Sequence, residues 1–173
     1  MKLVYLLALP LLAFRADDWQ PFSLDKQVSV RLPVKPIEMT KEETGDLPVG
    51  AHMFAALTTG EAYQLSGPLP VPAALDTQDA RARGIFYEGV VTGLVKEQGN
   101  TLLWRKPFST AVGEGVTVAY QSPATQDSKA MILFSRVFIV KRSFYSLTFF
   151  QADGDSTNSV ARRRFFSSIT VKP

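Results

Sequence analysis

The sequence contains no cysteine and a single histidine, His52, among its 173 residues. Without a thiol, the chain can have no cysteine nucleophile, no redox pair and no zinc or iron–sulfur site built on cysteine. One histidine cannot form a multi-histidine metal site. His52 also lies in a stretch that predicts a strand, which favours a histidine at the strand surface over a catalytic one.

Motifs that mark nucleotide-binding sites and hydrolases are also absent. The chain has no GxxxxGKS or GxxxxGKT phosphate loop, no GxGxxG dinucleotide fingerprint and no GxSxG nucleophile elbow. Gly113 and Gly115 are spaced like part of a phosphate cradle, but the intervening Glu114 would repel a phosphate. We therefore expect no catalytic residue, no metal site and no cofactor.

The N-terminus has the pattern of a secretory signal peptide. Lys2 supplies positive charge, residues 3–12 are almost entirely apolar, and the small Ala13 and Ala16 follow. This apolar run is too short to span a bilayer, which takes roughly 20 residues. We predict a signal peptide over residues 1–16, cleaved after residue 13 or 16, and a single exported domain over residues 17–173, in the periplasm or outside the cell. The alternative is a buried N-terminal helix or strand.

Removal of this signal would leave almost no net charge. The whole chain has 19 basic and 16 acidic groups, for a formal charge of +3, and Lys2 and Arg15 lie within the predicted signal. The remaining 17 basic groups nearly balance the acidic ones. We therefore expect no nucleic-acid partner.

Apolar periodicity predicts strands interrupted by two helices. The predicted strands are Val28 to Leu32, Ala51 to Leu57, Ala62 to Leu65, Thr101 to Trp104, Phe108 to Ala111, Val116 to Gln121, Met131 to Val140 and Phe144 to Gln151. A first helix begins near Asp76 or Thr77, with Ala82, Phe86, Val90 and Leu94 as its buried stripe. A second helix, which carries Phe165, follows a turn at Asp153 to Ser156. The predicted fold class is α+β, a single antiparallel β-sheet flanked by helices, with the last two strands as a central hairpin.

The segments between these elements read as loops. Lys35 to Pro48 is polar and predicts a solvated connection, and Gly67 to Pro72 predicts a stiff proline-rich loop. Close packing of the Gly89–Gly93 edge on a sheet would compensate for the cost of glycines inside the first helix.

Two acidic clusters and a set of aromatic residues are candidates for binding. Glu42, Glu43 and Asp46 form the first cluster, and Asp153 with Asp155 forms the second, which lacks most of the oxygen ligands of a calcium loop. We interpret both as solvated turns, and a carboxylate enzyme that uses calcium or magnesium is the alternative. Four aromatic residues could form a ligand platform, but strand aromatics favour a place in the core. They are Trp19, Phe22, Trp104 and Phe108.

The basic residues offer a candidate surface for an anionic partner. Arg162, Arg163 and Arg164 form the densest basic run, and Lys141 with Arg142 lies at the predicted hairpin turn. Consecutive helical residues point about 100° apart, so the three arginines spread around the helix. If these groups converge, anionic membrane headgroups or another anionic partner fit them. Otherwise they solubilise the surface and balance the helix dipole.

Two stretches of the chain resemble the PsbP-like family. Phe22 to Asp25 and Val28 to Pro33 are similar to the family's opening. The strand Phe144 to Phe150 and the segment Ala161 to Ile169 are similar to its ending. The resemblance implies an antiparallel sheet flanked by helices, the sandwich that PsbP shares with the Mog-type Ran-binding proteins. Family members bind a membrane complex or a GTPase, but none of their binding residues can be matched here.

These observations favour a non-enzymatic binding or accessory domain that acts outside the cytoplasm. The expected partner is a protein or another envelope component, and contact with a membrane surface is considered. The alternatives are the carboxylate or metal-dependent enzyme and a peripheral factor that binds anionic headgroups through its basic helix.

Overall fold

The computed structural model describes residues 19–97, 99–124, 129–151 and 159–172. The predicted signal peptide and the turn at Asp153 to Ser156 lie outside the described residues. In chain order the elements are β1 (Gln20–Ser23), β2 (Val28–Leu32), β3 (Ile37–Glu38), α1 (Lys41–Thr44), β4 (His52–Leu57), β5 (Glu61–Pro70), α2 (Ala80–Thr92), a π-helical turn η1 (Gly93–Glu97), β6 (Thr101–Thr110), β7 (Gly113–Gln121), β8 (Ile132–Val140), β9 (Ser143–Gln151), α3 (Val160–Ser167) and β10 (Thr170–Val171).

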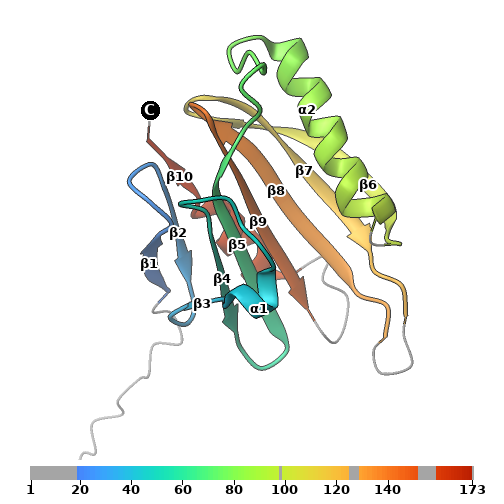
Figure 1. Ribbon diagram of the computed structural model, residues 1–173. Coiled ribbons are helices and arrows are strands. Elements are labelled where there is room, and N and C mark those ends of the chain that lie inside the picture. The colour runs from blue at the N-terminus through green and yellow to red at the C-terminus, as the bar shows by residue number, and fades with distance from the viewer. Residues whose placement is uncertain (1–18, 98, 125–128, 152–158, 173) are drawn as a thin grey trace, which may run out of the picture.

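The strands form two antiparallel sheets, so the expectation of a single sheet was wrong. Seven strands are ordered β3-β4-β5-β9-β8-β7-β6, and a separate sheet is ordered β1-β2-β10 (Figure 1). In the smaller sheet, Val28 pairs with Val171, so strands from opposite ends of the chain lie side by side. Such long-range pairing leaves no local pattern in the sequence. The α+β class and the antiparallel strands are confirmed.

The two faces of the seven-stranded sheet pack against different elements. On β8, Phe134 and Phe138 pack with the three-stranded sheet and α3, whereas the alternating Val137 and Ile139 pack with α2. This alternation follows from the two-residue period of a strand. The fold therefore has two apolar cores, one on each side of the central sheet.

Most strand predictions from local patterns are confirmed. Residues Val28 to Leu32 form β2, the predicted strands Ala51 to Leu57 and Ala62 to Leu65 correspond to β4 and to part of β5, and β8 and β9 form the central hairpin. The proline-rich segment differs, because β5 continues to Pro70 with a register shift between Ser66 and Leu69. A shift of this kind allows a strand to accommodate residues that would otherwise break its ladder.

Helix α2 starts later than expected, and its most buried residues lie one position after those of the predicted stripe. Asp79 is its N-cap and accepts hydrogen bonds from the backbone N–H groups of Arg81 and Ala82. Tyr87 and Val91 are its buried residues, whereas Phe86, Val90 and Leu94 are only partly buried against the same core. A Cβ at Gly89 would meet nothing within 4 Å, so close packing does not explain that glycine. No described helix is long and apolar enough to cross a membrane.

Helix α3 completes the second core. Phe165 is fully buried and meets Tyr63 edge-on, with ring centroids 5.1 Å apart. Three of the four aromatic residues considered as a ligand platform are partly buried against this core, which confirms the core interpretation for Trp19, Phe22 and Phe108. Trp104 differs: it lies on the edge strand β6, is 37% exposed, and reaches the core only through its ring contact with Phe134.

Candidate functional site

Lys141 and Arg142 lie at the tip of the β8–β9 hairpin, where both are exposed. Arg142 is engaged within the fold, because its guanidinium donates to the carbonyl oxygens of Pro72 at 2.7 Å and of Ala73 and Leu75 at 3.1 Å. This places Arg142 as a clamp on the loop between β5 and α2. Lys141 occupies the turn with a positive φ of 55°.

The three arginines of α3 lie on the opposite side of the large sheet. The guanidinium carbon of Arg162 lies 3.9 Å from the centroid of the Phe134 ring, and that of Arg164 lies 5.0 Å from the Trp19 ring. Arg163 is exposed. Phe134 is six residues from Val140 at the hairpin end of β8, about 20 Å along a strand. The structure therefore does not bring the two basic groups together on one patch.

The first acidic cluster stabilises a loop. Glu43 accepts a hydrogen bond from the backbone N–H of Thr40 at 2.7 Å, and Lys41 pairs with Asp46 at 2.7 Å. Hydrogen bonds to a backbone N–H and to Thr40 lower the pKa of Glu42. No group of three acidic or histidine side chains suited to a metal ion occurs among the described residues. Asp153 and Asp155 lie outside them.

His52 is an exposed residue of β4, as expected for a strand histidine. Its Nδ1 lies 2.6 Å from Glu38 Oε1 on the neighbouring strand β3. Both side chains are about half exposed. Because neither a nucleophile nor a second base is paired with His52 in the described structure, this contact ties the short edge strand β3 to β4.

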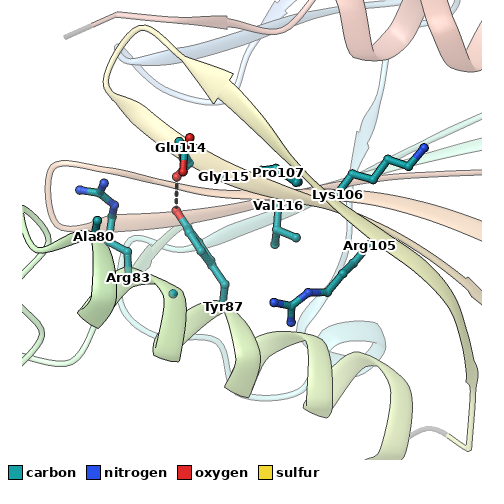
Figure 2. A pocket seen from close by; sticks show the side chains of 10 residues that line it. Ala80, Arg83, Tyr87, Arg105, Lys106, Pro107, Glu114, Gly115 and Val116 are labelled. Carbon is teal, nitrogen blue, oxygen red and sulfur yellow. Dashed lines mark hydrogen bonds between the residues drawn. The ribbon is translucent and has the colours of Figure 1, made fainter.

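A cleft of about 310 Å³ lies between α2 and the strands β6 and β7 (Figure 2). Arg83 and Tyr87 come from the helix, and Arg105 and Glu114 come from the strands. The Tyr87 hydroxyl donates to the Glu114 carbonyl at 3.0 Å and accepts from the Ile139 backbone N–H at 3.1 Å.

Three polar side chains of this cleft are already used by the fold. Burial raises the pKa of Tyr87, which keeps its hydroxyl protonated and unsuited to act as a base. Arg105 forms an ion pair with Glu88 on α2, and Arg83 donates to the carbonyls of Thr77 and Gln78. The contacts hold α2 on the sheet, and they offer no activated nucleophile.

An apolar groove of about 560 Å³ occupies the other half of the same sheet face. The floor of the groove is formed by residues that pair directly across neighbouring strands and therefore lie on the same face of the sheet. The pairs are Ile37 with Ala55, Leu57 with Ala62, and Ala62 with Phe150. Helix α2 lies over β6, β7 and β8 instead (Figure 1). The side chains of Ile37 and Leu57 are 76% and 69% exposed. The groove lining is Val34, Lys35, Ile37, Glu38, Met39, Glu43, Ala55, Leu57, Ala62, Tyr63, Gln64 and Phe150.

Sequence reasoning missed this apolar groove. Ile37 lies in the segment Lys35 to Pro48, which reads as a polar connection, yet it forms the edge strand β3. The apolar side chains gather only through pairing across β3, β4, β5 and β9. The available signal was the pair of apolar residues Ile37 and Met39, which lie in this polar segment and both line the groove.

Comparison with known proteins identifies a fold and no family. No protein-family model and no curated protein matches the sequence. The Ran-binding protein Mog1p of Saccharomyces cerevisiae matches 89% of this chain and 95% of its own, with 10% identity and a TM-score of 0.53. A mutant of protein Mog1 matches 90% of this chain and 96% of its own, with 10% identity and a TM-score of 0.52. At this identity the likeness shows the fold alone. The chain therefore has a Mog1-like fold, and membership of the PsbP-like family stays a prediction.

Proposed function

We propose that this chain is an exported, non-catalytic binding or accessory domain, and that its apolar groove receives an apolar segment of a protein partner. The Mog1-like fold supports a role in protein binding, since a solved neighbour is a Ran-binding protein. The N-terminal pattern supports export. Among the described residues, no group of acidic or histidine side chains is suited to hold a metal ion, and Arg83, Tyr87 and Arg105 of the cleft beside α2 are engaged within the fold.

The observation that carries the proposal is the exposure of large apolar side chains along a concave surface. Ile37 and Leu57 are mostly exposed, and both line the groove. Apolar patches bordered by polar groups mark interaction sites. Covering the exposed part of each side chain would contribute roughly 1–2 kcal/mol to binding. Lys35, Glu38 and Glu43 also line the groove and would orient a partner through its polar groups.

A pair of charge-introducing variants tests the groove. Leu57→Lys places a charge on the groove floor, and Ile85→Lys makes the same change on α2, where Ile85 is 65% exposed and lies outside the groove. Cross-linked partners recovered from native envelope fractions should be lost with Leu57→Lys and kept with Ile85→Lys. Equal recovery with both variants would contradict the groove proposal.

Export is tested separately. The mature protein is expected outside the cytoplasm, with an intact mass that corresponds to a start at residue 14 or 17. A cytoplasmic protein that retains residues 1–16 would refute export, and the comparison of Leu57→Lys with Ile85→Lys would then be made in the cytoplasmic fraction.

A further inference from the structure

Arg136, on β8, is a partly buried arginine with no carboxylate partner among the described residues. Its Nη1 donates to the Phe166 carbonyl at 2.8 Å, near the C-terminus of α3. Its Nε is buried and has no hydrogen-bond partner. The guanidinium carbon lies 4.8 Å from the Phe108 ring centroid and 5.0 Å from that of Phe166.

These contacts leave the charge incompletely compensated. A guanidinium has five N–H donors and stays protonated in proteins. In this structure, one backbone carbonyl accepts a hydrogen bond from the Arg136 guanidinium, and two aromatic rings lie against it. Burial lowers the pKa of Arg136 without a neighbouring charge to oppose that effect. A desolvated cation without an anionic partner is costly, which makes a bound anion the natural complement.

Arg136 lines a pocket of about 360 Å³ between the end of β6 and strand β10. The pocket has hydroxyl groups from Ser109, Thr110 and Thr170, and it has no acidic residue. Its remaining walls are apolar side chains. They belong to Phe108, Ala111, Ile169 and Val171.

We propose that this Arg136 pocket binds a carboxylate that carries a short apolar body. The planar guanidinium pairs with the carboxylate, the Ser109 hydroxyl donates a further hydrogen bond, and the apolar walls cover the hydrocarbon part. The Thr110 hydroxyl is already used within the fold, because it donates to the Gly113 carbonyl at 2.7 Å. The carboxylate belongs either to a free small acid or to the C-terminus of a peptide. The site is built on the α3 side of the sheet, so it does not depend on the apolar groove.

Arginine-selective NMR of the Nε–H groups gives a direct readout. The probes are 3-methylbutanoate and its neutral amide, at constant ionic strength, followed by inorganic phosphate. The Arg136 signal should shift saturably with 3-methylbutanoate only. A dipeptide with a free C-terminus, compared with its C-terminal amide, then separates the two sources: tighter binding of the free-ended peptide than of 3-methylbutanoate assigns the site to peptide ends.

Three variants complete the experiment. Arg136→Met should weaken 3-methylbutanoate binding about 30-fold or more, the effect of removing one partner of a buried charge pair. Ser109→Trp should fill the pocket and leave Arg136 intact. The binding of 3-methylbutanoate to this variant, followed on the Arg136 signal, should also be lost. Arg164→Met is the matched control, because Arg164 also lies over an aromatic ring and is outside this pocket. Its affinity should equal that of the wild type.

Other outcomes would overturn the proposal. They are no saturable shift in the wild type, an equal response to the amide or to phosphate, and unchanged binding in Arg136→Met or in Ser109→Trp. A lower Tm of Arg136→Met together with no carboxylate binding by the wild type would assign Arg136 to capping α3 alone. If Arg136→Met does not fold, Ser109→Trp decides.

Discussion

The hydrogen bond between Tyr145 and Asp25 should be a principal link between the two sheets. The hydroxyl of the fully buried Tyr145 on β9 donates to Asp25 Oδ2 at 2.5 Å. The other carboxylate oxygen accepts the backbone N–H groups of Gln27 at 2.7 Å and Val28 at 2.8 Å, which shapes the turn from β1 to β2. One carboxylate thus orders the turn and ties it to the large sheet.

Tyr145→Phe removes only the hydroxyl and leaves one carboxylate oxygen without this donor. A hydrogen bond to a charged group contributes about 1.5–3 kcal/mol, so the variant should lose that much stability. Tyr120→Phe is the control, because the Tyr120 hydroxyl lies 3.2 Å from the neutral Ser135 hydroxyl. Its expected loss is about 0.5–1.5 kcal/mol.

Urea unfolding near neutral pH, followed by circular dichroism, measures these losses. Asp25→Ala combined with Tyr145→Phe completes a double-mutant cycle with an expected coupling of about 1.5–3 kcal/mol. A coupling near zero, or a Tyr145→Phe loss no larger than that of Tyr120→Phe, would refute the assigned role.

Three further predictions concern glycine, Arg142 and tyrosine ionisation. Gly115→Ala should lower the free energy of unfolding by about 1–3 kcal/mol, because the added Cβ would lie 2.6 Å from Phe108 Cε1 and 2.7 Å from the Val137 carbonyl oxygen. Gly89→Ala should raise the free energy of unfolding by about 0.5–1 kcal/mol, because the added Cβ meets no atom within 4 Å and alanine favours a helix. Arg142→Met should raise amide hydrogen exchange of Val71, Ala73, Ala74 and Leu75 by about tenfold, since the loop loses the three hydrogen bonds that Arg142 donates to its carbonyls. Burial and the hydrogen bonds to Glu61 and Asp25 raise the pKa of Tyr63 and Tyr145 in the folded protein. The unfolded chain therefore loses these tyrosine protons first, so the contribution of the two tyrosines to the free energy of unfolding should be fully present below about pH 10 and fall above it.

Each of these predictions has a clear contrary result. A tolerated Gly115→Ala, or a destabilised Gly89→Ala, in urea unfolding would contradict the local packing. Exchange that Arg142→Met leaves unchanged would show that the loop does not need its clamp. Urea midpoints that stay constant from about pH 9 to about pH 11 would contradict the tyrosine prediction.

Local patterns predicted the elements whose identity depends on nearby residues. The alternation in β2 and the apolar runs of β8 and β9 reflect burial on one or both faces, so the sequence shows them. Two strands were predicted at Thr101 to Trp104 and Phe108 to Ala111, but β6 runs unbroken from Thr101 to Thr110. It is the edge strand, where Pro107 can be tolerated.

Features that depend on distant residues could not be predicted in this way. The separate sheet requires β2 to pair with β10, and no local pattern shows that pairing. The basic residues were visible as charges, yet the carbonyls that hold Arg142 and the rings beneath Arg162 and Arg164 come from elsewhere in the chain. The sequence pattern did not mark Arg136 as a candidate, because it lies within an apolar strand and only the tertiary structure shows that its charge is unpaired.

The most direct test of the binding role places a photo-cross-linking amino acid at one position of the groove and at one position outside it. In the native envelope, a probe at Leu57 should form a discrete adduct with a protein partner. A probe at Ile85, of similar exposure on α2, should not form that adduct. Identical adducts from both positions, or none from Leu57 while Ile85 cross-links, would contradict the proposal that the apolar groove is the partner-binding surface.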